Sequence, residues 1–266
     1  MEHQLKFKIA QTVFLINCRD KKIISWLKQN YAPFLCRQKP HLEAIVKFDK
    51  AWARDQGKQA VSSVDSKAGV FSYHFETFDA EIDLSNNIAR LLSADRSNIT
   101  VMMRFLSSLM LSRAGGFLLH SCAIVKDGFS YVFFGESGSG KTTIARLSKN
   151  KLILTDETTA LLNKNGGWFA YATPFAGEFG QPGKNAGAKV RACFSLNKSK
   201  QFAHSIFDQS GAVKQLSYSA FLNNGDYPMI DRALTAIEKL AKQVPCYDLY
   251  FKAEPQIWRY IDGFLG

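Results

Sequence analysis

The residues best suited to chemistry lie between Tyr131 and Leu147, which read YVFFGESGSGKTTIARL. Four β-prone residues come first, the spacing G-x-x-x-x-G-K-[ST] follows from Gly135 to Thr142, and a helix-forming run comes last. Glycines let backbone N–H groups turn inward around phosphates, and the start of a helix adds a positive dipole. The pattern, with a strand before it and a helix after it, predicts a nucleotide phosphate site rather than a plain glycine-rich turn.

Two side chains of this motif have expected roles of their own. Lys141 can reach the β- and γ-phosphates, and the hydroxyl of Thr142 can ligate Mg²⁺. The residues predicted to bind the nucleotide are Gly135, Glu136, Ser137, Gly138, Ser139, Gly140, Lys141, Thr142 and Thr143.

A pair of acidic residues follows the motif after a short gap. Leu152–Leu154 read as a buried strand that ends in Thr155, Asp156 and Glu157. A β-α-β crossover of this length places Asp156 at the carboxyl end of a strand near the P-loop strand. A carboxylate there can reach Mg²⁺ and the γ-phosphate, although a strand-end turn or a helix cap also explains an Asp-Glu pair.

The elements that must position these residues form a mixed pattern. Residues 97–113 predict a helix with Ser97 as N-cap, and residues 117–135 predict a β-hairpin around Lys126-Asp127-Gly128, so the P-loop strand is reached through a hairpin. A second hairpin is predicted around residues 164–167. Residues 174–200 begin as a Gly/Pro-rich loop and continue as a strand. This segment carries five basic residues with no acid between Glu178 and Asp208: Lys184, Lys189, Arg191, Lys198 and Lys200.

The rest of the chain predicts alternating short elements. After residue 200 we expect a strand at 201–207, a turn at 208–212, helices at 221–224 and 229–244, a strand at 246–252 and a terminal helix at 254–265. Residues 1–95 read as a smaller α/β scaffold or recognition domain, with strand-like segments at 7–18, 42–48 and 70–85, a helix at 21–32 and a polar connection at 49–69. Residues 96–266 form the predicted catalytic domain.

Composition sets wide bounds on function. The chain has 266 residues, of which 46% are hydrophobic and 21% charged, and a net charge of +11 spread over both halves. This even spread argues against a dedicated nucleic-acid arm and suits a protein that handles anionic ligands or an acidic partner. A plain solvated surface explains the charge nearly as well. The five cysteines are far apart and lack C-x-x-C spacing, so neither a disulfide framework nor a zinc site is expected. No apolar run is long enough for a bilayer and no secretory signal stands at the N-terminus, so a cytoplasmic protein without membrane contact is expected.

These motifs together resemble a known family. His120, the run GESGSGKT after a hairpin, and an acidic pair beginning 15 residues beyond Lys141 (156 minus 141) resemble the catalytic domain of HPr kinase/phosphorylase. The similarity is closer to the HPr-kinase-like P-loop kinases found beside peptide-modification genes. It covers residues 117–178, and residues 244–262 resemble the C-terminal end of that group. The phosphoenolpyruvate carboxykinases share the same core, but this chain is far too short to be one. The resemblance implies an α/β fold with a P-loop kinase core of mixed sheet and a smaller N-terminal α/β domain.

The resemblance also implies a role for each matching residue. Lys141 would neutralise phosphate charge, and Asp156 would be the general base that takes the proton from an attacking hydroxyl. His120 would lie near Asp156 and tune or orient it, unless it is a core histidine of an apolar strand. The implied metal ligands are Thr142, Glu157 and Glu178, of which Glu178 reads equally well as a surface residue. Lys189 and Arg191 share a strand face and are either solvated or phosphate-binding.

Three departures from the family narrow the expected activity. Thr143 stands where the HPr kinases have Glu, the pair Asp156-Glu157 replaces Asp-Asp, and the Arg-Gly-Leu-Gly signature of phosphorylase function is absent. The departures favour kinase activity over the reverse phosphorolysis, without deciding whether phosphorylase activity exists. We therefore expect an ATP- and Mg²⁺-dependent kinase that acts on a hydroxyl of a peptide or small protein, most simply a serine. The alternatives are a small-molecule kinase of the same fold and a nucleotide-dependent switch or sensor without transferase activity. The oligomeric state stays open, a homo-oligomer included.

Overall fold

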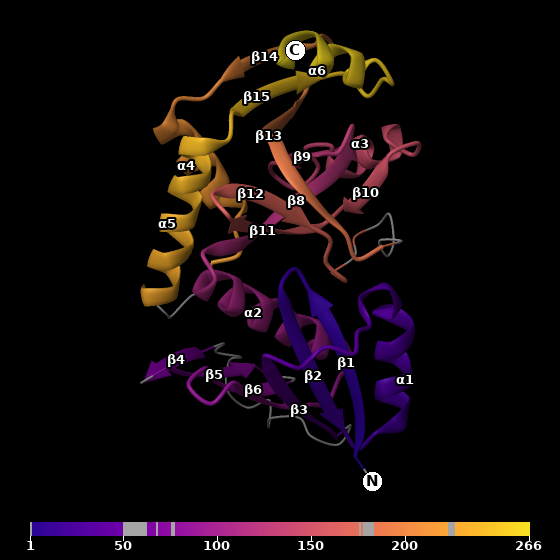
Figure 1. The fold of residues 1–266 in the computed structure, drawn as a ribbon, viewed down its shortest axis with the longest axis vertical. Coiled ribbons are helices and arrows are strands. Elements are labelled where there is room, and N and C mark those ends of the chain that lie inside the picture. The colour runs from indigo at the N-terminus through magenta and orange to yellow at the C-terminus, as the bar shows by residue number, and fades with distance from the viewer. Residues whose placement is uncertain are drawn as a thin grey trace, which may run out of the picture. The chain divides into compact units, whose positions relative to one another are not determined.

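A computed structural model describes residues 2–49, 63–67, 69–75, 78–175, 177, 184–222 and 227–266. The chain divides into two compact units, one of Met1–Met110 with Leu222–Ile230 and one of Leu111–Phe221 with Asp231–Gly266. Helices α2 (Ser97–Arg113) and α5 (Tyr227–Gln243) both cross this division. The predicted domain boundary after residue 95 lies just before α2 (Figure 1).

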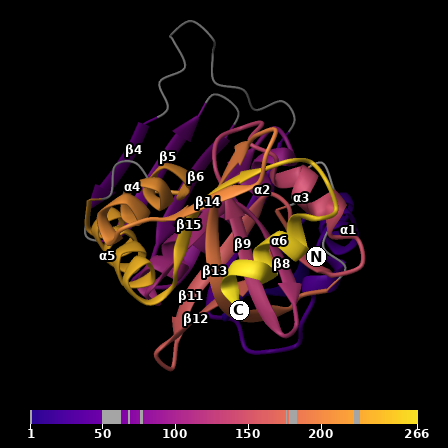
Figure 2. The same cartoon turned by 90° about the horizontal axis from the view of Figure 1, so that it is seen from above.

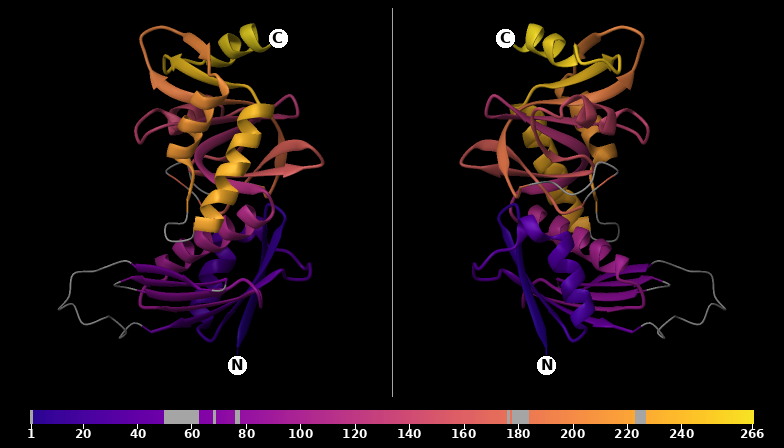
Figure 3. Two further views of the ribbon diagram at one scale, coloured as in Figure 1. Left: turned by 90° about the vertical axis from the view of Figure 1, so that its left-hand side faces the viewer. Right: turned by 90° about the vertical axis from the view of Figure 1, so that its right-hand side faces the viewer.

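The first unit is built on a mixed sheet. In its described part, seven strands lie in the order β1-β2-β3-β7-β6-β5-β4, with β2, β3 and β7 parallel. Helix α1 (Lys21–Asn30) buries Ile23 and Leu27 and lies against β1 and β2 (Figure 3). The strands are β1 (His3–Ile9), β2 (Thr12–Cys18), β3 (Leu42–Phe48), β4 (Ser63–Lys67), β5 (Val70–Phe75), β6 (Phe78–Asp83) and β7 (Ile88–Ser93).

Two segments predicted as single strands turn out to be hairpins. Residues 7–18 fold back on themselves between β1 and β2, with Ala10 at φ +50°, and residues 70–83 form the antiparallel pair β5 and β6. The alternating apolar pattern is the same in one long strand and in two paired strands, so it did not reveal the turns. The helix predicted over residues 97–113 is confirmed as α2, and its apolar face is buried.

The second unit contains the predicted site. Its sheet is mixed: β8 pairs antiparallel with β9, β10 and β11, whereas β13 pairs parallel with β9 and β15. A short edge strand, β14, completes the sheet beside β15. The strands are β8 (Gly116–Lys126), β9 (Phe129–Phe134), β10 (Leu152–Thr155), β11 (Thr158–Lys164), β12 (Gly167–Tyr171), β13 (Gly187–Lys198), β14 (Ala203–Ile206) and β15 (Cys246–Phe251).

The hairpin before the P-loop is confirmed. Asp127 and Gly128, between β8 and β9, have φ values of +51° and +80°, as a two-residue hairpin turn with the right twist requires. Over residues 123–125, β8 lies between β9 and β10. Because β9 and β10 are both antiparallel to β8, they run in the same direction. Their carboxyl ends therefore lie at the same end of the sheet.

The core of this unit lies between the sheet and helices α3 (Lys141–Leu147) and α6 (Ile257–Leu265). Helix α6 lies across β8, β9 and β13 (Figure 2), where Trp258 meets Tyr131 edge to face at 5.3 Å and Phe133 at 5.8 Å. The indole N–H of Trp258 donates to Ser148 Oγ at 2.9 Å. This contact fixes the end of α3, the helix that begins with the P-loop lysine.

Residues 208–219 differ from the prediction. The expected turn at 208–212 is the start of a helix, α4 (Gln209–Ser219), for which Asp208 is the N-cap and accepts a hydrogen bond from Gly211 N at 2.7 Å. Phe221 and Leu222, predicted as helical, are not in a helix, and the rest of that predicted helix lies outside the described residues. Throughout the described parts of both units, every helix is too short or too polar to span a membrane.

Candidate active site

The loop between β9 and α3 wraps around the ammonium group of Lys141. Lys141 Nζ donates to the carbonyl oxygens of Gly135 at 2.8 Å and Glu136 at 3.0 Å, and the lysine is only 7% exposed. Burial lowers the pKa of Lys141, while the nearby Glu157 and Cys122 oppose that shift. The nine predicted nucleotide-binding residues lie in this loop or in the first turn of α3.

Two details of the loop fit a phosphate ligand. Gly140 has φ +114°, and a Cβ there would lie 2.5 Å from Cζ of Phe251, so only glycine fits. The hydroxyl oxygen of Ser139 is buried and has no hydrogen-bond partner in the described structure. A buried hydroxyl without a partner is costly, and a phosphate oxygen would satisfy it.

The acidic pair forms the link between β10 and β11. Thr155 Oγ1 accepts hydrogen bonds from the backbone N–H groups of Glu157 at 3.2 Å and Thr158 at 3.1 Å, which fixes a tight turn. Both flanking strands pair with β8, and Ser121 N donates to Glu157 O at 3.1 Å. The pair is therefore tied to the strand that also pairs with the P-loop strand.

Asp156 is nearly buried, at 4% exposure, and its orientation is set by backbone. The N–H of Gly177 donates to Asp156 Oδ1 at 3.1 Å, and a Cβ on Gly177 would lie 2.8 Å from Oδ2. Gly177 is not among the predicted site residues, although it stands directly before the predicted Glu178. Glu178 itself lies outside the described residues.

Cys122, in β8, is a buried thiol next to the strand ends that carry the loop and the acidic pair. Burial raises the pKa of its thiol, the charge of Asp156 raises it further, and the charge of Lys141 lowers it. Ser121, the residue before Cys122, pairs with Phe134 at the end of β9, and its N–H donates to the carbonyl oxygen of Glu157 at 3.1 Å, so the start of the loop and the acidic pair flank the same strand. The ends of β9 and β10 thus bring together a cation and two carboxylates.

His120 faces this group from β8. Its Nδ1 lies 3.4 Å from Glu157 Oε1, and the two side chains are 31% and 30% exposed. His120 stands opposite Thr158 in the register of β8 and β11, which explains why it meets the residue just before that strand. At this exposure His120 is not a fully buried core residue.

A cleft of about 570 Å³, here called the P-loop cleft, opens beside the loop. One side consists of the loop and β8, and the other consists of the end of α4 and the residues after it. The lining residues are His120, Gly135, Glu136, Ser137, Gln215, Tyr218, Ser219, Ala220 and Phe221. The α4 side was missed because α4 was not predicted; its signals are the N-cap Asp208 and the buried pair Ala212 and Leu216.

The donor set suits a metal ion that arrives with phosphates. Among the described residues, no group of three or more His, Cys, Asp or Glu side chains could hold a metal by itself. Mg²⁺ in kinase sites usually takes one or two carboxylates and completes its octahedron with phosphates and water. The hydroxyl of Thr142 and the carboxylate of Glu157 fit that pattern. Arg191 instead donates from Nη2 to the carbonyl of Leu265 at 3.1 Å, so it serves the end of α6.

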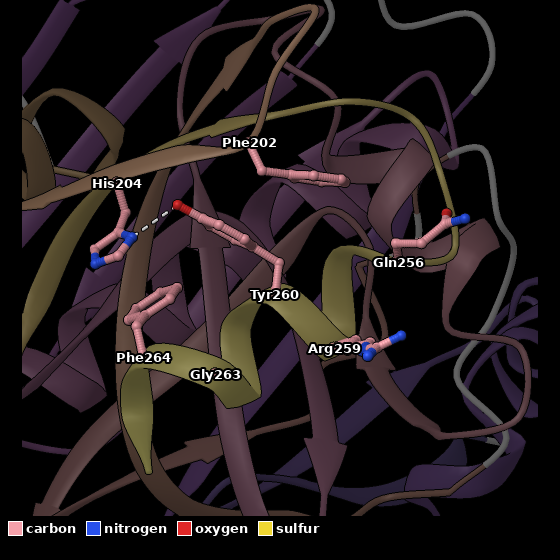
Figure 4. Close-up of a pocket in the computed structure, with 7 residues that line it drawn as sticks. All are labelled: Phe202, His204, Gln256, Arg259, Tyr260, Gly263 and Phe264. Carbon is pink, nitrogen blue, oxygen red and sulfur yellow. Dashed lines mark hydrogen bonds between the residues drawn. The ribbon is translucent and has the colours of Figure 1, made fainter.

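A second cavity of the same unit, here called the aromatic pocket, has about 460 Å³ and lies between β14 and α6 (Figure 4). His204 Nδ1 lies 2.9 Å from the hydroxyl of Tyr260, and the His204 ring stacks on Phe264 at 3.7 Å. It contains no predicted site residue. The lining residues are Phe202, His204, Gln256, Arg259, Tyr260, Gly263 and Phe264.

Comparison with known proteins gave a family and a structural match. A family model described as "SynChlorMet cassette protein ScmC" matches residues 87–265, which include every predicted site residue. No curated protein matches the sequence. A solved structure described as "Structure of the Hpr(Ser) kinase/phosphatase from Coxiella burnetii" matches with 12% sequence identity and a TM-score of 0.33. The match covers 56% of this chain and 87% of that one.

Proposed function

The chain belongs to the family of SynChlorMet cassette protein ScmC, and we propose that it is an ATP- and Mg²⁺-dependent kinase. It transfers the γ-phosphoryl group to a hydroxyl, that of a serine in a peptide or small protein. One observation carries the proposal: Lys141, a buried ammonium held by loop carbonyls, and the acidic pair Asp156-Glu157 follow two strands, β9 and β10, that run in the same direction on either side of β8.

The loop supplies the phosphate contacts. An ammonium group has three N–H donors, and two of those of Lys141 go to loop carbonyls, so one can reach a phosphate oxygen. Backbone N–H groups of residues 136–138 and 140–142 and the hydroxyl of Ser139 can donate to the other oxygens, whereas the N–H of Ser139 already donates to Glu136 O. Positioning and charge stabilisation of this kind supply most of the catalysis in phosphoryl transfer.

The two carboxylates have different roles in the proposed reaction. Asp156, oriented by the N–H of Gly177, accepts the proton of the attacking hydroxyl. The hydroxyl oxygen bonds to Pγ while the bond from Pγ to the β,γ-bridging oxygen breaks. ADP is the leaving group. Thr142 and Glu157 would hold Mg²⁺, with Glu178 as a further contact, and the ion supplies neutralisation of phosphate charge when bound. His120 orients Glu157 through their 3.4 Å contact.

The test uses γ-labelled ATP, the full chain and a cytosolic extract as the acceptor source, with nucleotide binding measured separately. We expect Lys141→Ala to abolish transfer. Asp156→Asn should lower the transfer rate by about 10²- to 10⁴-fold while ATP affinity stays within a few-fold. Lys214→Ala and Asp231→Asn, both exposed, are the matched controls.

The other outcomes separate the alternatives. Loss of ATP binding in both site variants would make Asp156 structural. Label that appears only in free metabolites would indicate a small-molecule kinase. If the wild type and Asp156→Asn both bind nucleotide and neither labels any acceptor, the result would indicate a nucleotide-dependent switch or sensor without transferase activity.

A further inference from the structure

The position of the P-loop cleft relative to the loop shows which end of a nucleotide it would meet. The cleft is lined by Gly135, Glu136 and Ser137, the first residues of the loop. The carbonyls of Gly135 and Glu136 are also the groups that hold Lys141 Nζ. Because the lysine of this motif reaches the β- and γ-phosphates, a cleft at these residues opens at the γ-phosphate end.

The far wall of the cleft is fixed to β8. After α4 the chain extends at Ala220, which forms a bridge with Leu119, and Phe221 N donates to Leu118 O at 2.9 Å. Ala220, in this wall, therefore stands opposite Leu119, the residue next to His120 in β8. Backbone pairing of this kind makes the wall a defined surface rather than a loose segment.

One face of α4 is presented to the cleft. Gln215, Tyr218 and Ser219 line the cleft, and Gln215 lies three and four residues before the other two, whereas Ala212 and Leu216 are buried on the adjoining face. The Tyr218 residue is 78% exposed. A large aromatic ring held in water at the rim of a cleft is the type of residue that contributes most to recognition of a partner.

The charge of the lining restricts the occupant. Among the described residues that line the cleft, Glu136 is the one with a full charge and none is a lysine or an arginine, although the chain carries a net charge of +11. An acidic segment would meet Glu136 and the nucleotide phosphates without a compensating cation. Like charges brought together at an interface are disfavoured, so an uncharged occupant fits better.

We propose that the P-loop cleft binds the acceptor, and that Tyr218 packs against an uncharged aromatic or aliphatic side chain next to the acceptor hydroxyl of a peptide segment. This inference rests on the proposed kinase function and adds a substrate class to it. Gln215 and Ser219 can hydrogen-bond the backbone of such a segment. The five basic residues between Lys184 and Lys200 are outside the cleft lining, so an acidic acceptor is not selected there.

The experiment measures transfer from ATP to two probe peptides, Gly-Gly-Phe-Ser-Phe-Gly-Gly and Gly-Gly-Asp-Ser-Asp-Gly-Gly, by the full chain. Wild type should use the Phe-flanked peptide at least tenfold better in kcat/KM. Tyr218→Ala should raise the KM for that peptide by about 5- to 30-fold with an unchanged KM for ATP, because it removes one aromatic contact. Tyr218→Phe should keep the wild-type KM, and Ile206→Ala, an exposed apolar residue outside the cleft, is the control.

The outcomes are separable from those of the proposed function. Equal use of both peptides, an unchanged KM in Tyr218→Ala, or ATP binding with transfer to neither peptide would overturn the inference, even if a protein acceptor is labelled in the extract. Failure of the wild type to bind ATP, measured by titration without acceptor, would overturn the proposed function and the inference with it. A KM for ATP that rises as much as the KM for peptide in Tyr218→Ala would make Tyr218 a structural residue.

Discussion

The P-loop cleft and the aromatic pocket belong to the same unit and have similar volumes, about 570 and 460 Å³. In the loop beside the first, Gly140 has φ +114°, the ammonium of Lys141 is buried, and the hydroxyl of Ser139 has no partner among the described residues. Around the second, rings stack on one another and the His204 and Tyr260 polar atoms are paired. Strained backbone and unsatisfied polar groups persist where a ligand compensates them, whereas ring stacking stabilises the fold by itself. Changes at the first should therefore affect ligand binding, and changes at the second should affect stability alone.

The largest contrast should come from one glycine beside each cavity. Gly140→Ala places a methyl group 2.5 Å from Phe251 Cζ at a positive φ, so the loop must move. We expect nucleotide affinity to fall at least about 100-fold, with a loss of about 1–3 kcal/mol in unfolding free energy. Gly263→Ala, in α6, meets nothing within 4 Å and should raise unfolding free energy by about 0.5–1 kcal/mol with normal nucleotide binding. Titration with ATP measures the nucleotide affinity, and urea unfolding measures the free energy of unfolding. Equal nucleotide affinity in Gly140→Ala and Gly263→Ala would contradict a ligand-binding role for the loop at Gly140.

A second glycine, Gly177, contacts the predicted general base, Asp156. Gly177→Ala brings a methyl group to 2.8 Å from Asp156 Oδ2 and should turn the carboxylate away from the acceptor. We expect the transfer rate to fall by about 10- to 100-fold, as small displacements of catalytic groups do, with ATP affinity within about twofold. Single-turnover transfer with saturating ATP is the measurement. A normal rate in Gly177→Ala would mean that this contact does not position Asp156 for catalysis.

The smallest effect is expected in the aromatic pocket. Tyr260→Phe removes the 2.9 Å contact with His204 and keeps the ring stacked on Phe202 at 5.1 Å. The unfolding free energy should fall by about 0.5–1.5 kcal/mol, the usual net value of one hydrogen bond. Phosphoryl transfer should be unchanged. If the transfer rate of Tyr260→Phe fell as much as that of Gly177→Ala, the two cavities would be functionally coupled, and the aromatic pocket would not affect stability alone.

Local signals in the sequence predicted the strand, loop and helix of residues 131–147, the hairpin before them and the strand that ends at the acidic pair. Asp127-Gly128 specified a tight turn because these residue types tolerate positive φ. The short gap between Lys141 and Asp156 limited the crossover to one short helix, so the carboxylate had to follow a nearby strand that runs in the same direction. Both signals depend on residues close together in the chain, which is why they could be read without the structure.

The other half of the cleft depends on contacts that sequence patterns do not encode. α4 contains Ser210, Gly211 and Ser217, which are weak helix formers, and only Ala212 and Leu216 are buried, so its apolar period is faint. The position of Tyr218 follows from the pairing of residues 220 and 221 with β8, far away in the chain. The contact of Gly177 with Asp156 is likewise a tertiary contact between a loop and a strand end.

Helix α4 lies late in the chain, and this has a consequence for how the protein matures. β8, β9, β10 and β11 and the acidic pair between them span residues 116–164 and are joined by short connections, so the entropy lost in closing them is small. Synthesis delivers this stretch dozens of residues before Gln215 to Phe221. We expect the nascent chain to bring Lys141, Asp156 and Glu157 together first and to add the wall of the P-loop cleft that α4 and residues 220–221 form only afterwards.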